Sequence, residues 1–218
     1  MTNEFGKRIL SSLILIPLSF FFIFKGSIFF ILFLLFCFLI SSFEWFMMSK
    51  KKNYQLIGYF FLIFSFYCTY SLRNNFEDKS LFIFLTIIII CISTDIGGYI
   101  FGKVFKGPKL TKISPKKTFS GVAGGYLLSI IAINIFFYYS YVYFAQFNKF
   151  STNTLILVLL VSTISQIGDI IVSYFKRLSK IKNTGNIIPG HGGMLDRIDG
   201  MIFAFPFSYI VFYLELST

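Results

Sequence analysis

Charged residues are scarce in this chain, and their scarcity excludes a soluble domain. Of its 218 residues only 13% are charged and 56% are hydrophobic, with a mean hydropathy of +0.77. Soluble globular domains carry about a quarter charged residues. Long apolar runs follow one another along the sequence instead, and they predict an all-α fold, a polytopic integral membrane helix bundle.

Cysteine and histidine are also rare. The three cysteines, Cys37, Cys68 and Cys91, each lie within an apolar run without CxxC spacing, which argues against a disulfide framework or a cysteine metal site. Because the chain has one histidine, a metal site would use carboxylate oxygens as ligands, and these favour Mg²⁺ over zinc.

The net charge of +11 raises the question of a nucleic-acid partner. No RNP motif, zinc knuckle or helix-turn-helix pattern is present, and the basic residues occupy short loops between apolar runs. In such loops basic residues set membrane topology and meet anionic lipid headgroups. We therefore predict contact with membrane lipids and no nucleic-acid partner.

Apolar segments that could cross a bilayer recur along the whole chain. A spanning helix needs about 20 apolar residues, so we expect about seven transmembrane helices, of which the first and last are short. The first segment is preceded by two basic residues but followed by no small-residue cleavage site, which favours a retained helix over a signal peptide. The segments are roughly 9–24, 27–48, 54–72, 80–100, 120–146, 154–174 and 200–216.

Basic residues are distributed unevenly between the two sides of these spans. Sixteen of the 20 Lys and Arg residues fall on the side of the N-terminus, which predicts a cytoplasmic N-terminus and an external C-terminus. No linker divides the chain, so we predict a single transmembrane domain, 1–218. Within it, 1–90 would form N-terminal helices and 91–200 a catalytic half, with cytoplasmic loops at 101–120 and 175–199.

Five of the nine acidic residues lie near the predicted cytoplasmic ends of spans, and four different spans supply them. An aspartate costs about 2.5–3.5 kcal/mol at the centre of a spanning helix, so several acids at one depth beside a lysine-rich loop predict a metal and phosphate site. Asp196 and Asp199 are three residues apart and would share one face of a helix. The five acids are Glu44, Asp95, Asp169, Asp196 and Asp199.

Two polar segments at the same predicted face are suited to phosphate. The segment 168–200 holds five basic residues, three aspartates, the histidine and several glycines, which let a backbone approach phosphate closely. The segment 114–121 reads SPKKTFSG and places Lys116, Lys117 and Thr118 before the fifth span, whose first N–H groups favour anions. A topological signal with lipid headgroup contact is the alternative for these lysines, although the segment SPKKTFSG favours phosphate. For Gly124–Gly125 helix packing is as well supported as phosphate contact.

These residues together resemble bacterial CDP-diacylglycerol synthase, also called phosphatidate cytidylyltransferase. The resemblance covers 91–200 in detail, and it has two departures: Asn183 stands where the family usually has Asp, and Ser120 where it usually has Glu. The matching motifs are Ser173-Tyr174-Phe175-Lys176-Arg177, then Lys182, then Pro189-Gly190-His191-Gly192-Gly193 and Asp196-Arg197-Ile198-Asp199, with Asp95, 114–118 and Gln166-x-Gly168-Asp169 upstream.

The resemblance implies that CTP and phosphatidic acid react to give CDP-diacylglycerol and pyrophosphate. The reaction would belong to phospholipid biosynthesis, and the active site would face the cytoplasm from the bacterial inner (plasma) membrane. We expect Mg²⁺, with a second cation left open, on Asp169, Asp196 and Asp199, with Asp95 either as a further ligand or as a partner that contacts the ligands. We expect phosphates to be held by Lys176, Arg177, Lys182, Arg197, Lys116, Lys117, Thr118, Ser173, Gly192, Gly193 and His191, the last having a turn contact as its alternative.

Two other functions stay open from the sequence. A CTP-dependent polyprenol or lipid-alcohol kinase shares the nucleotide and the membrane setting, but it would release CDP rather than pyrophosphate. A small transporter would use the aspartates as an ion path, although here they gather at one face rather than traverse the bilayer. The DGxxAR motif of CDP-alcohol phosphotransferases is absent. The oligomeric state is also open, with a homodimer as one option.

Overall fold

The described residues of the computed structural model are entirely helical apart from turns and loops. They comprise 2–76, 79–111, 113–114, 116–144, 150–187, 190 and 192–217. These residues form no strand, and Lys109 and Thr118 form an isolated β-bridge. The all-α prediction is confirmed. The helices are α1 (Thr2–Lys25), α2 (Ser27–Ser49), α3 (Gln55–Asn74), α4 (Ser80–Phe105), α5 (Phe119–Phe144), α6 (Thr152–Leu178), α7 (Leu195–Ile198) and α8 (Met201–Ser217).

The long helices coincide with the apolar segments of the sequence. Within the described part of the chain, α2 to α6 are the five helices long and apolar enough to cross a membrane. Shorter apolar stretches lie in α1, at Ser11–Lys25, and in α8, at Met201–Leu214. The polytopic membrane architecture is therefore confirmed, whereas a count of seven spans and the side of the N-terminus stay predictions.

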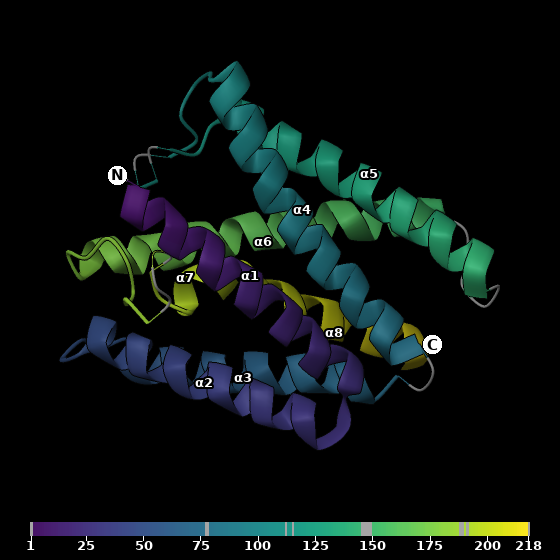
Figure 1. Ribbon diagram of the computed structural model, residues 1–218, viewed down its shortest axis with the longest axis horizontal. Coiled ribbons are helices and arrows are strands. Elements are labelled where there is room, and N and C mark those ends of the chain that lie inside the picture. The colour runs from purple at the N-terminus through teal and green to yellow at the C-terminus, as the bar shows by residue number, and fades with distance from the viewer. Residues whose placement is uncertain are drawn as a thin grey trace.

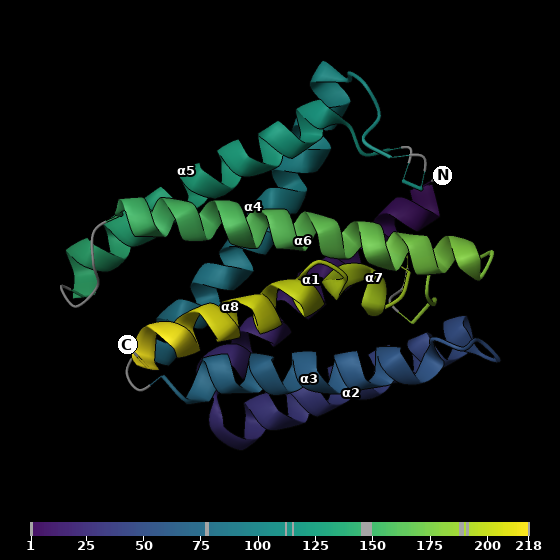
Figure 2. The ribbon, with the colours of Figure 1, turned by 180° about the vertical axis from the view of Figure 1, so that it is seen from behind.

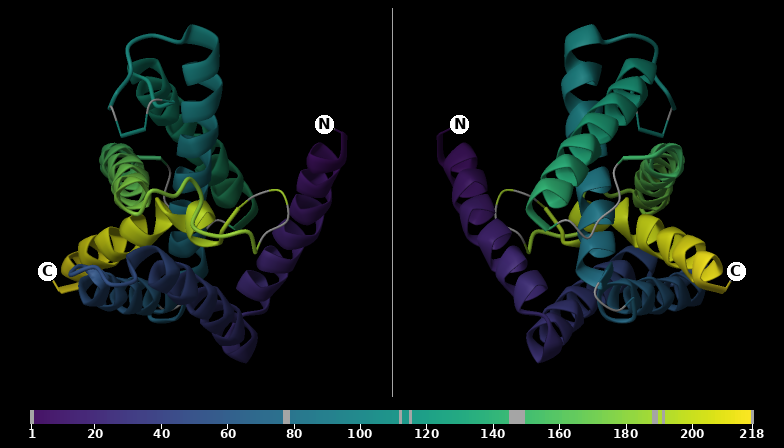
Figure 3. Two further views of the ribbon diagram at one scale, coloured as in Figure 1. Left: turned by 90° about the vertical axis from the view of Figure 1, so that its left-hand side faces the viewer. Right: turned by 90° about the vertical axis from the view of Figure 1, so that its right-hand side faces the viewer.

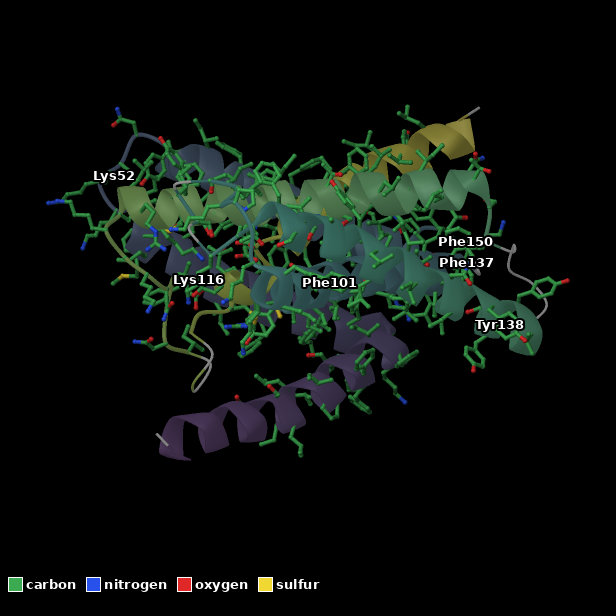
Figure 4. The ribbon with its side chains drawn as sticks, turned by 90° about the horizontal axis from the view of Figure 1, so that it is seen from above. Lys52, Phe101, Lys116, Phe137, Tyr138 and Phe150 are labelled. Atoms are coloured by element: carbon green, nitrogen blue, oxygen red, sulfur yellow. The ribbon has the colours of Figure 1, made fainter. Side chains whose placement is uncertain are left out.

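The loops that the sequence places on the cytoplasmic side gather at one end of the bundle. The α2–α3 turn, the α4–α5 loop and the α6–α7 loop lie together there, and the C-terminus lies at the opposite end (Figures 1 and 2). Lys52 and Lys116 mark the first end in Figure 4, whereas Phe137, Tyr138 and Phe150 mark the other. Segments far apart in the sequence thus meet at the lysine-rich end.

The helices pack as a bundle from which α1 stands apart. α8 packs against α3 and α6, α2 lies along α3, and α4 and α5 form the most extensive pair. α1 packs on α2 at the edge, and the end-on views of Figure 3 show it diverging from the other helices. Near the lysine-rich end a buried cluster fixes α2, α3, α6, α7 and α8 against one another. Its members are Trp45, Met48, Leu62, Val172, Leu195 and Ile202.

Glycines bring α4 and α5 into backbone contact. A Cβ atom on Gly97 would lie 2.3 Å from the carbonyl oxygen of Gly124, and a Cβ on Gly124 would lie 2.3 Å from the Phe101 ring. Gly125 is buried against the Thr94 carbonyl in the same interface. Of the two explanations that the sequence left open for Gly124–Gly125, the structure therefore supports helix packing.

A second close crossing joins α6 to the start of α8. A Cβ on Gly168 would lie 3.0 Å from the Asp199 carbonyl oxygen and 2.6 Å from the Phe203 ring. A Cβ on Gly200 would lie 2.4 Å from the Ser165 hydroxyl. Asp169 follows Gly168 and Asp199 precedes Gly200. The crossing therefore brings these two aspartates together.

The α4–α5 contact can be tested with two neighbouring substitutions. Gly97→Ala places a methyl group against the Gly124 backbone, whereas at Gly98 a Cβ would meet only the Gly121 carbonyl at 3.7 Å, an ordinary contact. Overpacking typically costs about 1–3 kcal/mol. We therefore expect Gly97→Ala to lower the midpoint of thermal unfolding in detergent by several degrees and Gly98→Ala to leave it nearly unchanged. Equal midpoints would contradict the close packing.

Candidate active site

Carboxylates from three separate elements meet at the lysine-rich end of the bundle. Asp95 comes from α4, Asp169 from α6 and Asp199 from the junction between α7 and α8. Asp199 lies within hydrogen-bonding reach of Asp169, and Asp95 is close enough to both to act on them electrostatically. The convergence of acids that the sequence predicted is therefore present for these three residues.

Two lysines approach this group of acids from different sides. Lys117, from the α4–α5 loop, places its Nζ 2.6 Å from Asp169 Oδ2 and donates to the Gln166 carbonyl at 3.2 Å. Lys176, buried on α6, lies 3.9 Å from Asp199 Oδ2 and also contacts Asp196. Opposite charges within about 4–6 Å favour the ionised form of each partner. The lysines therefore stabilise carboxylates that would otherwise repel one another.

The two aspartates of the Asp-Arg-x-Asp segment lie in different electrostatic environments. Burial, together with the carboxylates of Asp169 and Asp95, raises the pKa of Asp199 well above its ordinary value, and Lys176 opposes part of this rise. Burial would also raise the pKa of Asp196, but the hydrogen bond and charge of Lys176, with two backbone N–H groups, outweigh it and leave that pKa below its ordinary value. Further positive charge near Asp199 would lower its pKa, as Lys176 already does for Asp196.

Asp196 is engaged by the backbone of its own loop. Its Oδ2 accepts hydrogen bonds from Thr184 N at 2.9 Å and Gly193 N at 3.2 Å, and its Oδ1 accepts one from Lys176 at 2.8 Å. We predicted that Asp196 and Asp199 would both point at one metal or one metal pair, and this stays a prediction. In the structure Asp196 organises the α6–α7 loop, and Asp199 lies within hydrogen-bonding reach of Asp169.

The predicted phosphate-binding residues divide into inner and outer groups. Ser173 joins the inner group, because its hydroxyl donates to Asp169 Oδ1 at 3.3 Å. Arg197 lies at the edge of the acids, where its charge acts on Asp95. The outer group consists of exposed basic residues on the α4–α5 loop, in the last turn of α6 and on the α6–α7 loop. Its members are Lys116, Arg177 and Lys182.

Three of the other predicted phosphate ligands have structural contacts of their own. The Thr118 hydroxyl accepts from Gly121 N at 3.1 Å and so caps the start of α5. Gly193 N is used by Asp196, while Gly192 has a φ of +93°, a conformation that favours glycine. Phosphate contact by these residues stays a prediction. His191 lies outside the described residues.

Of the two departures from the family pattern, Ser120 lies in the first turn of α5 and Asn183 lies on the α6–α7 loop. The Ser120 hydroxyl hydrogen-bonds the Lys106 carbonyl and the Thr118 hydroxyl, so it closes the base of the α4–α5 loop. Asn183 is exposed beside Gly192 on the α6–α7 loop. Neither residue replaces a member of the acid group.

Sequence reasoning gave Glu44 no specific role, although it counted this residue among the acids at the predicted cytoplasmic face. In the structure Glu44 is buried beneath the α6–α7 loop and hydrogen-bonded to it three times. The sequence did contain a signal for such a role, because Glu44 is an acid inside an apolar span with no basic residue one helical turn away. Such an acid must find its partners elsewhere in the fold.

Comparison with known proteins shows which family this chain resembles. A model of the Cytidylyltransferase family matches residues 55–215, which include every residue of the acid and lysine groups. The phosphatidate cytidylyltransferase of Rickettsia bellii is 34% identical over 213 residues, covering 94% of this chain and 89% of that protein. The family match therefore extends well beyond the signature segment.

Two further relatives share the same name. The phosphatidate cytidylyltransferases of Bacillus subtilis and Haemophilus influenzae are 38% and 39% identical to this chain over 141 and 145 residues. These matches cover 64% and 61% of the chain, but only 50% and 46% of the relatives. The chain thus spans about half the length of these two proteins and most of the Rickettsia protein. By the extent of the family match and of its similarity to these relatives, the chain belongs to the cytidylyltransferase family.

Proposed function

We propose that this protein is a phosphatidate cytidylyltransferase, which converts CTP and phosphatidic acid to CDP-diacylglycerol and pyrophosphate. The observation that carries the proposal is the group formed by Asp95, Asp169 and Asp199 with Lys117 and Lys176, at the end of an apolar bundle where the lysine-rich loops meet. Such a site can bind two phosphate-bearing substrates, one of which is a membrane lipid.

The reaction requires positioning and charge stabilisation more than proton transfer. A phosphate oxygen of the lipid, already anionic at neutral pH, attacks the α-phosphorus of CTP. The bond from that phosphorus to the bridging oxygen breaks, and its electron pair leaves with pyrophosphate. Because nucleophile and leaving group are both anionic, the protein must bring two polyanions together and stabilise the departing charge.

The donor chemistry of the acid group suits a divalent cation. Its donors are hard carboxylate oxygens, and Asp169 lies within hydrogen-bonding reach of Asp199. Within the described residues, however, no three acid, histidine or cysteine side chains are grouped as closely as a metal requires. We propose that Asp169 and Asp199 hold Mg²⁺, with Asp95 and Asp196 as further ligands and room for a second cation. When bound, Mg²⁺ would neutralise phosphate charge.

The basic residues would supply the remaining phosphate contacts. Lys117 and Lys176 reach the acids and would contact phosphates bound there, whereas Lys116, Arg177, Lys182 and Arg197 lie further out. Ser173 could donate its hydroxyl to a phosphate in place of Asp169 Oδ1. Arg197 can form two parallel hydrogen bonds to one phosphate, which a lysine cannot.

The location of the site suits a lipid substrate. The acyl chains of phosphatidic acid can stay in the membrane while the headgroup reaches the lysine-rich end. We propose that this end faces the cytoplasm from the bacterial inner membrane, because the majority of basic residues lie on its side. CTP would then enter from the cytoplasm.

Product analysis separates this reaction from the kinase alternative. Purified protein in detergent would be given phosphatidic acid, Mg²⁺ and CTP labelled at the α-phosphorus. We expect label to enter a lipid with release of one pyrophosphate per lipid labelled. Label that stays in water-soluble CDP while the lipid gains unlabelled phosphate would establish lipid phosphorylation instead.

The acid group can be tested by Asp199→Asn. The amide keeps the shape of the side chain but removes the negative charge, so we expect turnover to fall by about a hundredfold or more, as for other preorganised electrostatic groups. The unfolding midpoint without metal should not fall, because the substitution removes a carboxylate buried beside Asp169. Near-normal turnover in a folded variant would rule out Asp199 as a metal ligand.

A further inference from the structure

Glu44 occupies a buried position beside the loop that carries the signature residues. It lies near the end of α2 and is only 2% exposed. Figure 2 shows α7 between α6 and the α2–α3 pair, and α2 contacts α7 directly. The carboxylate of Glu44 contacts the α6–α7 loop and the start of α7 from α2.

The contacts of Glu44 are hydrogen bonds from neutral groups. Its Oε1 accepts from Met194 N at 2.9 Å, and its Oε2 accepts from Leu195 N at 2.8 Å and from the Thr184 hydroxyl at 2.8 Å. In the described part of the chain no lysine or arginine forms an ion pair with it. Met194 and Leu195 start α7, where backbone N–H groups have no partner within the helix. Glu44, on α2, thus supplies the hydrogen-bond acceptor for these two N–H groups.

The loop backbone lies directly against this carboxylate. A Cβ atom on Gly193 would lie 2.5 Å from Glu44 Oε2, and a Cβ on Gly185 would lie 2.6 Å from Oε1. A Cβ at either position would force a neighbour such as Glu44 to shift. The two glycines therefore let the loop approach Glu44 without displacing its carboxylate.

Glu44 and Asp196 hold the same loop from two sides. Thr184 gives its hydroxyl to Glu44 and its N–H to Asp196, while Gly193 N also binds Asp196. Lys176 then links Asp196 to the acid group. A change at Glu44 would therefore reach Asp199 and Arg197 through the position of α7.

The end of α2 is fixed independently of Glu44. The Ser179 hydroxyl donates to the Met48 carbonyl at 2.6 Å, and Trp45 packs edge-on against Phe175 at 5.3 Å between ring centroids. These contacts attach α2 to the end of α6 without involving the loop between 184 and 195. Loss of the Glu44 charge should then release the loop and leave the bundle intact.

We propose that Glu44 is a positioning residue for cytidylyl transfer: its buried carboxylate fixes the start of α7 and thereby sets Asp196, Arg197 and Asp199 for the reaction. The effect on catalysis rests on the proposed function, whereas the effect on the loop does not. Glu44 acts through the loop and contacts no substrate itself.

Glu44→Gln is the direct test. Either orientation of the amide turns its NH₂ group toward a backbone N–H, because Oε1 and Oε2 each accept one. We expect kcat to fall about ten- to a hundredfold, as for groups that orient metal ligands, while KM for CTP changes less than about threefold, because Lys116 and Lys117 lie on a different loop. Hydrogen exchange should become faster in 184–198 and stay unchanged in the spanning helices.

Ser41→Ala is the matched control. Ser41 lies one turn earlier on α2, is fully buried, and its hydroxyl has no hydrogen-bond partner among the described residues. This variant should keep the wild-type kcat and exchange pattern. Wild-type kcat and loop exchange in Glu44→Gln would overturn the proposal, as would faster exchange throughout the bundle, which would indicate a general structural role.

Thr184 provides a second test if Glu44→Gln does not fold. Thr184→Val removes one donor to Glu44 and should lower kcat severalfold with faster exchange at Met194 and Leu195, and Thr184→Ser, which keeps the hydroxyl, should restore both. Unchanged kcat and exchange in Thr184→Val would overturn the proposal. If the wild type transfers no cytidylyl group, the proposed function fails, but the exchange results still decide whether Glu44 fixes the loop.

Discussion

Mutual repulsion among neighbouring carboxylates is the constraint on which the rest of this structure depends. Asp95, Asp169 and Asp199 come from different elements and converge at one end of an apolar bundle, where Asp199 is buried, Asp169 is partly exposed and Asp95 is exposed. Lys117 and Lys176 offset part of the repulsion. The two lysines do not balance all three carboxylates, and the remaining negative charge attracts cations. A site of this kind can bind a metal together with the phosphates that the metal accompanies.

The apolar part of the chain holds this charged group in place by close contact between backbones. Where α6 crosses the start of α8, Gly168 and Gly200 leave no room for side chains, and the adjoining aspartates are brought together as a result. The buried Glu44 adds a polar contact that holds the α6–α7 loop from beneath. Rigid helices and a loop fixed at both ends supply the positional accuracy that phosphoryl chemistry requires.

Much of this arrangement could be predicted from the sequence, because charge is conspicuous in an apolar chain. The helices follow from the apolar runs, and the meeting of Asp95, Asp169 and Asp199 follows from their common depth. The separate environment of Asp196 could not be predicted, because its partners are Lys176 and loop backbone groups brought together by folding. The same holds for Glu44, whose donors lie about 140 to 150 residues away along the chain.

The central claim is that the carboxylate group binds a divalent cation, and a binding measurement without substrates tests it most directly. The midpoint of thermal unfolding would be followed in detergent as Mg²⁺ is added to the wild type and to Asp169→Asn. A ligand that binds only the folded state raises this midpoint with its concentration. We predict a saturable rise for the wild type and little or none for Asp169→Asn. No rise in the wild type, or the same rise in both proteins, would contradict the metal site.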